Sequence, residues 1–314
     1  MTDAATVATH SCDQNPISGL PLHALAGFTH RWVNAQGIRL HAVEGGQPTE
    51  PAVVLLAGFP QTWWAWRKVM PSLAERFHVI AIDLPGQGHS DRPHDSYDTH
   101  TVAARVQAAV TALNVSKYWL VAHDIGAWVA FSIALNYEQH LHGVALLDAG
   151  IPGITLPDAI PTDPELAWKT WHFAFHLVPD LPETLLAGRE RDYIEWFLTV
   201  KALSPNTFDS AEINHYAAAV AAEGGLRASL AYYRDAAESA RKNHDALERQ
   251  HVTVPVLGIS SSHGSIPDMA ASIRPWADNT TGVTIPHAGH FIPDEQPEAV
   301  ADALTAFIDD ERVG

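Results

Sequence analysis

Short apolar runs alternate with longer amphipathic segments along most of the chain, and this alternation predicts the fold class. Apolar runs of the kind found in strands buried on both faces occur at 52–56, 78–83, 118–123 and 144–147. Segments with helical spacing follow the first three of these runs, at 62–75, 99–113 and 125–137. Strands that alternate with helices predict an α/β fold with a mostly parallel central sheet flanked by helices.

The two ends and the middle of the chain depart from this alternation. Two β-patterned pieces around 34–37 predict a hairpin, whereas residues 155 to about 249 show helical patterns only. Strands are predicted again at 254–260 and 282–286, and a last helix at 297–309. We therefore divide the chain into segments that share one predicted organisation each: an N-terminal arm (1–26), an α/β core (27–153 and 251–314) and a helical insertion (154–250).

Charge and composition narrow the possible partners. The formal net charge is −17, and such a surface repels nucleic acid and anionic membranes. No stretch approaches the roughly 18 apolar residues of a membrane span, and the first 25 residues lack the pattern of a signal peptide. Cys12 is the one cysteine, so no internal disulfide is possible. These features predict a cytoplasmic protein that acts on a small molecule, with neither nucleic acid nor membrane as a partner.

A carboxylate interrupts the apolar pattern where a predicted strand gives way to a helix. In the stretch LVAHDIGAWVAF, Asp124 follows the strand, with Ala122 two residues before it and Gly126 two residues after it. Chemistry in open α/β sheets collects at the carboxyl ends of strands, and only small neighbours fit a tight strand-to-helix turn. This pattern is that of a nucleophile elbow, G-x-S-x-G, with aspartate as the nucleophile. The alternative is that Asp124 only caps the helix.

Segments after other predicted strands supply the remaining parts of such a site. The stretch LAGFP matches the H-G-x-P segment of an oxyanion hole, so the amides of Phe59 and Ile125 are its predicted donors. His290, in PHAGHFIPDEQPE, follows the last predicted strand, where this fold carries its general base. For His290 alone, the alternative is a solvated loop histidine.

Together these motifs resemble the α/β-hydrolase superfamily, and within it the branch with an aspartate nucleophile: epoxide hydrolases, haloalkane dehalogenases and haloacetate dehalogenases. The resemblance covers residues 28–312 and makes the helical insertion the cap of these enzymes. It implies that Asp124 attacks carbon to form an ester and that His290 activates the water that hydrolyses it. It implies no cofactor, and it is compatible with a homodimer. The 19 histidines lack the H-E-x-x-H zinc motif, so we predict no metal site.

The groups that stabilise the leaving atom distinguish the activities of this branch. A halide needs N–H donors, which haloalkane dehalogenases typically place where this chain has Ile125 and Phe59. Haloacetate dehalogenases typically carry arginines near the elbow, which are missing here, and a His-Trp pair in the cap, which is His172-Phe173 here. Dehalogenation of haloacids or haloalkanes is therefore the alternative activity.

An epoxide oxygen leaves as a basic alkoxide, so the cap must supply O–H or N–H acids. Epoxide hydrolases typically use a cap tyrosine followed by arginine, and Tyr233 precedes Arg234. With His172, this pattern resembles the Cif-like bacterial epoxide hydrolases, which open the ring with a histidine–tyrosine pair. The resemblance thus implies hydrolysis of small epoxides to vicinal diols, with His172 and Tyr233 as ring-opening residues. Their neighbours His176 and Tyr232 are the alternatives.

Two points remain open at this level. His290 needs a carboxylate partner, and we prefer Asp148, directly after the strand at 144–147, to Asp268, which lies on a long loop. The second alternative function is that of a non-catalytic effector or binding protein. Every catalytic position is filled in this sequence, which argues against that alternative. Aromatic residues are expected to line the substrate pocket, namely Trp128, Trp171 and Phe173.

Overall fold

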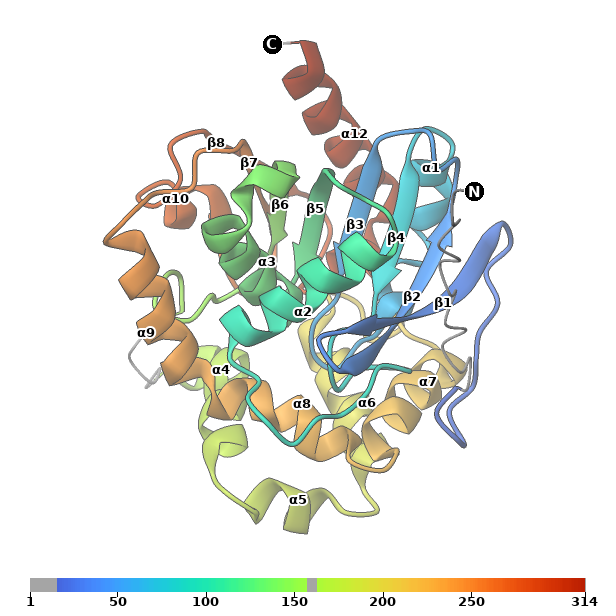
Figure 1. Ribbon diagram of the computed structural model, residues 1–314. Coiled ribbons are helices and arrows are strands. Elements are labelled where there is room, and N and C mark those ends of the chain that lie inside the picture. The colour runs from blue at the N-terminus through green and yellow to red at the C-terminus, as the bar shows by residue number, and fades with distance from the viewer. Residues whose placement is uncertain (1–15, 157–162, 314) are drawn as a thin grey trace, which may run out of the picture.

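The computed structural model describes residues 16–156 and 163–313 (Figure 1). Most of the predicted arm, including Cys12, lies outside the described residues. The described end of that arm contacts the core: the amide of Ile17 donates to Nδ1 of His89 at 3.1 Å, and the His23 ring lies 4.9 Å from that of Trp64.

The predicted mostly parallel sheet is confirmed. It has eight strands in the order β1-β2-β4-β3-β5-β6-β7-β8. The first two form the predicted hairpin and pair antiparallel, β2 pairs antiparallel with β4, and all later neighbours are parallel. The strands are β1 (Phe28–Ala35), β2 (Ile38–Gly45), β3 (Ala52–Leu56), β4 (His78–Ile82), β5 (Tyr118–His123), β6 (Leu141–Leu147), β7 (Val256–Ser261) and β8 (Thr280–Ile285).

Helices cover both faces of the sheet and create two apolar cores (Figure 1). Because side chains alternate along a strand, Val54 and Leu56 of β3 enter the core under α2 and α3, whereas Val53 and Leu55 enter the other. The flanking helices are α1 (Met70–Ala74), α2 (Thr99–Ala112), α3 (Ile125–Asn136), α10 (Met269–Ile273), α11 (Ile292–Glu295) and α12 (Pro297–Val313), with 3₁₀ turns η1 (Trp63–Trp66) and η2 (Glu138–His140).

The helix predicted over 62–75 is two pieces in the structure. The 3₁₀ turn η1 ends before Arg67, and α1 begins at Met70. Pro71 at the start of α1 explains the break, because proline lacks an N–H and fits the first turn of a helix better than its interior.

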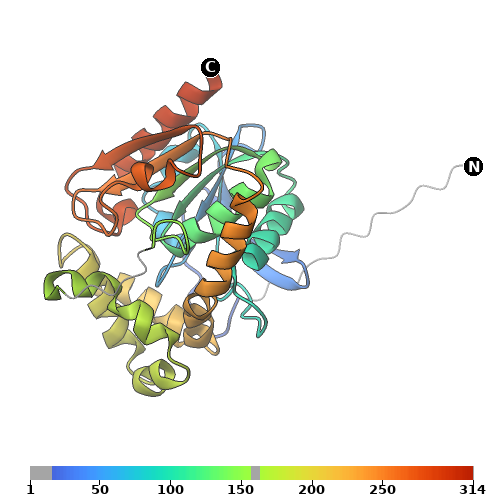
Figure 2. The ribbon, with the colours of Figure 1, turned by 90° about the vertical axis from the view of Figure 1, so that its left-hand side faces the viewer.

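Between β6 and β7 the described chain is helical, as the pattern predicted. In Figures 1 and 2, most of this segment lies beyond one end of the sheet, while its last helix runs back beside α2 and α3. The helices are α4 (Pro164–Leu177), α5 (Leu181–Leu186), α6 (Glu190–Lys201), α7 (Ser210–Ala221), α8 (Gly225–Arg234) and α9 (Ala236–Leu247).

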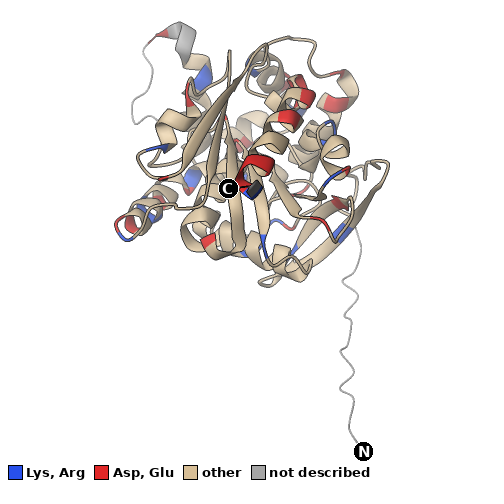
Figure 3. Ribbon diagram, turned by 90° about the horizontal axis from the view of Figure 1, so that it is seen from above, with Lys and Arg blue, Asp and Glu red and all other residues tan. Residues whose placement is uncertain are grey.

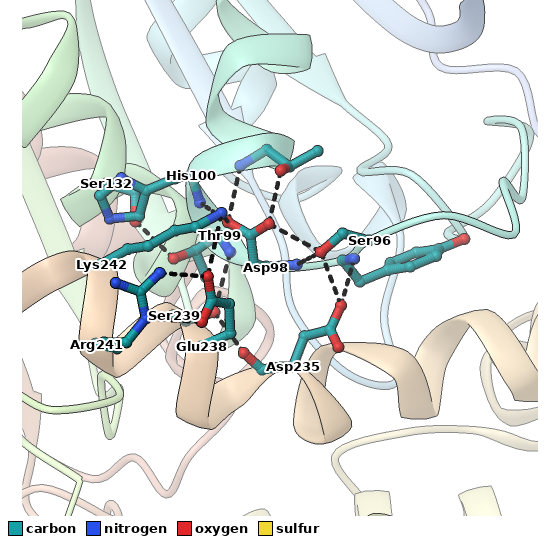
Figure 4. Close-up of polar contacts among 12 residues, drawn as sticks. Ser96, Asp98, Thr99, His100, Ser132, Asp235, Glu238, Ser239, Arg241 and Lys242 are labelled. Carbon is teal, nitrogen blue, oxygen red and sulfur yellow. Dashed lines mark hydrogen bonds and ion pairs between the residues drawn. The ribbon is translucent and has the colours of Figure 1, made fainter.

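Polar contacts fasten α9 to the start of α2 (Figure 4). The carboxylate of Asp98 caps α2, and Nζ of Lys242 lies 3.0 Å from its Oδ1. The backbone amides of Thr99 and Tyr97 donate to Ser239 Oγ at 3.0 Å and to Asp235 Oδ2 at 2.6 Å. The last helices of the helical segment are thereby held in one position on the core.

The acidic composition is visible on the C-terminal helix. Figure 3 shows acidic residues along α12, whose sequence PEAVADALTAFIDDERV carries five of them. In the part of the chain that the structure describes, no helix combines the length and apolar character needed to cross a bilayer.

Candidate active site

Asp124 occupies a strained turn between β5 and α3. Its backbone has φ 54° and ψ −125°, a conformation that non-glycine residues rarely adopt and that clusters at functional sites. Its side chain makes no capping hydrogen bond to α3, so it is not a helix cap. Instead, Oδ1 accepts a hydrogen bond of 2.8 Å from the amide of Phe59. The turn therefore presents the carboxylate to the loop after β3.

Small residues make this turn possible. A Cβ atom on Gly126 would lie 2.5 Å from the carbonyl oxygen of Leu56, so no larger residue fits without a backbone shift. A Cβ atom on Gly58 would lie 2.3 Å from Oδ1 of Asp124 and 2.4 Å from the amide nitrogen of Ile125. The amides of Phe59 and Ile125 thus both lie beside the carboxylate, as an oxyanion hole requires.

His290 lies between two carboxylates. Its Nδ1 is 2.7 Å from Oδ2 of Asp148, and its Nε2 is 3.5 Å from Oδ2 of Asp124. The imidazole is 2 % exposed, so it is not a solvated loop histidine. The structure therefore brings together the three residues that the sequence proposed as nucleophile, base and acidic partner.

The loop after β7 contributes backbone donors rather than an acid. The amides of Ser265 and Ile266 donate to the Asp148 carboxylate at 2.9 and 2.8 Å. Asp268, the alternative partner, instead accepts the amide of Ala271 and caps α10. Asp148 is consequently fixed by three donors and directed at His290.

The neighbouring charges shift the pKa of each of these groups. Burial alone would lower the pKa of His290, but its hydrogen bonds to Asp124 and Asp148 raise it above 6.5. Burial would raise the pKa of both carboxyl groups, yet the same hydrogen bonds to His290 lower both below the ordinary value. Asp124 is therefore ionised near neutral pH, the state that a nucleophilic carboxylate needs.

Two residues that the sequence reasoning missed hold the backbone of His290. Nε2 of His123 donates to the His290 carbonyl at 2.8 Å, and the His290 amide donates to the carbonyl of Lys201 at 2.9 Å. His123 immediately precedes Asp124, so the strand end that positions the carboxylate also positions the imidazole. Lys201 ends α6 and thus connects the helical segment to the base.

A cavity of about 270 Å³ opens onto these groups. Of the three aromatic residues expected to line the pocket, Phe173 lines this cavity, whereas Trp128 and Trp171 are not among its lining residues. Trp128 is buried against the rings of Tyr233 and Phe173, and Trp171 packs on other aromatic rings of the helical segment, including Trp196. The lining comprises Asp124, Asp148, Gly150, Leu156, Lys169, Thr170, His172, Phe173, Lys201, Ser265, Ile266, Pro267 and His290.

His172 and Tyr233 are adjacent to each other, although Tyr233 is not among the lining residues of this cavity. Their ring centroids lie 5.7 Å apart, and His172 lines the cavity. Burial lowers the pKa of His172 well below its ordinary value and raises that of Tyr233 well above. At neutral pH the imidazole is therefore neutral with one N–H, and the phenol keeps its O–H, so both are hydrogen-bond donors.

The alternative pair is engaged elsewhere. The hydroxyl of Tyr232 donates to the carbonyl of Pro85 at 2.8 Å, and Nε2 of His176 lies 2.6 Å from the hydroxyl of Tyr193. Packing on α4 and α8 thus distinguishes residues that the sequence left equivalent.

Lys201 also lines the cavity, and the sequence reasoning did not select it. A usable signal was present, because Tyr193, Ile194, Phe197 and Leu198 form the buried stripe of α6, and Lys201 continues it at helical spacing. A lysine on an apolar stripe is unusual, since burying an ammonium group is costly.

The sequence profile of the family described as alpha/beta hydrolase fold matches residues 51–297. The chain belongs to the α/β-hydrolase fold family. This α/β-hydrolase is 33% identical to a soluble epoxide hydrolase of Corynebacterium sp. (strain C12), over 89% of this chain and 97% of that protein. It is 28% identical to a fluoroacetate dehalogenase of Burkholderia sp, over 92% of this chain and 96% of that protein. These relatives support the general assignment of the chain as a hydrolase.

Solved structures share the fold of this chain. Cfl2 from Burkholderia cenocepacia shares 51% identity with this α/β-hydrolase, with a TM-score of 0.89 over 90% of this chain and 96% of that one. The Cif epoxide hydrolase from Acinetobacter nosocomialis, at 24% identity, has the same fold with a TM-score of 0.85 over 91% and 90%. Within residues 16–156 and 163–313, no group of three His, Cys, Asp or Glu side chains is arranged to hold a metal ion.

Proposed function

We propose that this protein is an epoxide hydrolase that converts small epoxides to vicinal diols through an aspartyl ester. The observation that carries the proposal is the Asp124 carboxylate, beside the His290–Asp148 pair, in a cavity that also contains His172. The named epoxide hydrolases among the relatives support the same substrate class.

Ring opening is the first chemical step. Oδ2 of Asp124 attacks an epoxide carbon, a C–O ester bond forms, and the C–O bond of the ring breaks. The departing oxygen accepts hydrogen bonds from His172 and Tyr233, and the phenolic proton of Tyr233 neutralises the alkoxide. Oδ1 of Asp124, which accepts the Phe59 amide, becomes the ester carbonyl oxygen.

Ester hydrolysis is the second step. His290 takes a proton from water, whose oxygen attacks the Asp124 carbonyl carbon, and Asp148 stabilises the imidazolium. The amides of Phe59 and Ile125 hold the negative charge that develops on the carbonyl oxygen. The ester C–O bond then breaks, and the departing alkoxide takes the remaining proton of the attacking water, which gives the diol and the Asp124 carboxylate. The imidazolium proton returns the Tyr233 phenolate to its neutral form. One water oxygen remains in the regenerated carboxylate.

We also propose that helices α4–α9, within residues 154–250, act as the cap of this enzyme. They supply His172, Phe173, Lys169 and Lys201 to the cavity, opposite Asp124 and His290 of the core. Water access and substrate size are then set by how these helices lie on the core.

Single-turnover reaction in oxygen-18 water tests the ester mechanism. Excess enzyme is mixed with styrene oxide or 1,2-epoxybutane, and the peptide that contains Asp124 is analysed by mass spectrometry. We expect label in the Asp124 carboxylate and no turnover by Asp124→Asn. Label that appears only in the diol, and never in the carboxylate, would disprove the covalent route.

The second candidate function is dehalogenation of small haloacids, which the 28% identity to a fluoroacetate dehalogenase favours. A halide leaves without a proton but needs N–H donors, and Phe173 offers none beside His172. Halide release from fluoroacetate and from a bromoalkane, measured beside the epoxides, decides between the two functions. Faster halide release than epoxide opening would replace the proposed function.

A further inference from the structure

The ammonium group of Lys201 is a charged group in the cavity that the proposed mechanism does not use. Lys201 is 4 % exposed, lines the cavity, and interacts electrostatically with the carboxylates of Asp124 and Asp148. Its Nζ lies 4.6 Å from the centroid of the Phe197 ring. A cation held inside the substrate cavity needs an explanation, because its burial is unfavourable without a counter-charge.

The carboxylates of the site attract this ammonium group but form no hydrogen bond or close ion pair with it. Asp148 accepts hydrogen bonds from His290 and two backbone amides, whereas Asp124 accepts one from Phe59 and lies 3.5 Å from Nε2 of His290. Within the described residues, the Lys201 ammonium has neither an ion pair within 4.0 Å nor a hydrogen bond. Its three N–H donors are therefore available to a molecule in the cavity.

Other polar atoms of the cavity wall are also without partners. Thr170 Oγ1, Ser265 Oγ and His172 Nδ1 are buried and make no hydrogen bond within the protein. Lys169 adds a second positive charge, although its Nζ donates to the carbonyl of Gly264 at 3.1 Å. Buried polar atoms without a partner are rare and need an explanation, and beside a cation they fit a site that binds a polar ligand.

The charge balance of the cavity differs from that of the whole protein. Two carboxylates, Asp124 and Asp148, face two lysines and an imidazole, while the chain carries a net charge of −17. Burial lowers the pKa of Lys201 to about 8, so the amine is still mostly protonated at neutral pH. An anion that enters this cavity thus meets a cation in a site of low dielectric constant, where attraction is strong.

We propose that Lys201 is a specificity-determining residue that binds an anionic substituent, foremost a carboxylate, of the epoxide substrate. The proposal rests on the proposed function for its reaction and adds the substrate class: small epoxides that carry a carboxylate near the ring. The carboxylate pairs with the Lys201 ammonium, and Thr170 and Ser265 supply hydroxyl donors from the cavity wall. The epoxide carbon is thereby directed at Asp124.

Paired substrates of equal shape test the charge requirement. Glycidate and glycidamide differ in a carboxylate against a carboxamide, and both are assayed at about pH 7 with the wild type and Lys201→Met. We expect Lys201→Met to lower kcat/KM for glycidate about 30-fold or more and to change that for glycidamide less than about 3-fold. An equal loss on both substrates, or no loss on glycidate, overturns the proposal.

Lys169→Met is the matched control, because it also removes a lysine from the cavity wall but one whose amine is tied to Gly264. Its effect on the ratio of the two substrates is expected to be clearly smaller than that of Lys201→Met. A variant Lys201→Arg should retain part of the preference for glycidate, since it keeps the charge. A larger effect of Lys169→Met than of Lys201→Met would move the anion site away from Lys201.

Binding of glycerate, the diol product of glycidate, separates this proposal from the proposed function. Glycerate and glycerol are titrated into wild type and Lys201→Met by calorimetry, which requires no turnover. Glycerate binding that is lost in Lys201→Met supports the anion site even if neither epoxide reacts, in which case only the proposed function fails. Glycerate binding that is absent, or equal in both proteins, refutes the anion site while leaving epoxide hydrolysis intact.

Discussion

Nδ1 of His290 lies 2.7 Å from Oδ2 of Asp148, although 142 residues separate them in the sequence. Asp148 directly follows β6, and the amides of Ser265 and Ile266 orient its carboxylate from the loop after β7. The pair is thus built on the ends of two neighbouring strands. Asp268, which the sequence offers as the other acid, faces the start of α10 instead.

This relationship predicts different outcomes for two Asp→Asn substitutions. Asp148→Asn removes the charge that stabilises the His290 imidazolium, and we expect kcat for styrene oxide to fall by about 10³-fold or more. Asp268→Asn keeps a good helix cap and should leave kcat within about 2-fold. Steady-state kinetics with circular dichroism of both variants makes the comparison. Similar losses in the two variants would contradict the assignment of Asp148.

Neighbouring tyrosines on α8 provide a second matched pair. Tyr233→Phe removes the O–H that protonates the opened epoxide, so kcat should fall about 100-fold with little change in stability. Tyr232→Phe removes the hydrogen bond to Pro85, so the free energy of unfolding should fall by about 1 kcal/mol while kcat is retained. Kinetics and urea unfolding are measured on both. A Tyr232→Phe enzyme as slow as Tyr233→Phe would exchange their roles.

The raised pKa of His290 predicts the acidic limb of the pH–rate profile. The imidazole must be neutral to accept a proton from water, so the rate of ester hydrolysis should rise with pH through a value above 6.5. Asp148→Asn removes one of the hydrogen bonds that raise this pKa, and the limb should move to lower pH. Hydrolysis rates of a neutral epoxide, recorded between about pH 5 and about pH 9, give the position of this limb for the wild type and for Asp148→Asn. A limb that does not move would show that another group titrates.

The carboxylate of Asp98, which lies away from the cavity, is expected to contribute to the stability of the fold. Burial would raise its pKa, but hydrogen bonds to Thr101 and Lys242 lower it to about 2. Because the pKa of Asp98 is lower in the folded protein than in the unfolded chain, the ionised carboxylate stabilises the fold at neutral pH. This contribution to the free energy of unfolding is lost as the pH falls through about 4 toward 2. Asp98→Ala should lower the free energy of unfolding by about 1–2 kcal/mol at neutral pH, with the helix cap as the main cause.

Lys242→Met is the control for that variant. It leaves the cap of α2 intact and removes a partly exposed ion pair, so its loss should stay below about 1 kcal/mol. Urea unfolding of both variants at neutral and acidic pH gives the two values. A loss in Lys242→Met that equals the loss in Asp98→Ala would assign the stabilisation to the ion pair rather than to the cap.

Local sequence pattern was enough to predict the features that depend on spacing within one element. The period and length of the apolar runs predicted the parallel sheet, the hairpin and the helical segment. A strand buried on both faces is a short continuous apolar run, whereas a helix buried along one stripe repeats its apolar residues about every three to four positions. The small residues around Asp124 indicated a tight turn for a steric reason that holds in any fold. Only near Pro71 did the helical pattern conceal a break.

Tertiary structure alone decided between residues that the pattern leaves equivalent. Tyr232 and Tyr233 are neighbours in the sequence, and His172 and His176 lie one helical turn apart. The packing of α4 and α8 nevertheless gives Tyr232 a hydrogen bond to Pro85 and His176 one to Tyr193. Two backbone amides, which no side-chain pattern encodes, bind Asp148 and distinguish it from Asp268 as the partner of His290. Lys201 entered the cavity because α6 lies over His290. Each depends on contacts between segments far apart in the chain, which local spacing does not specify.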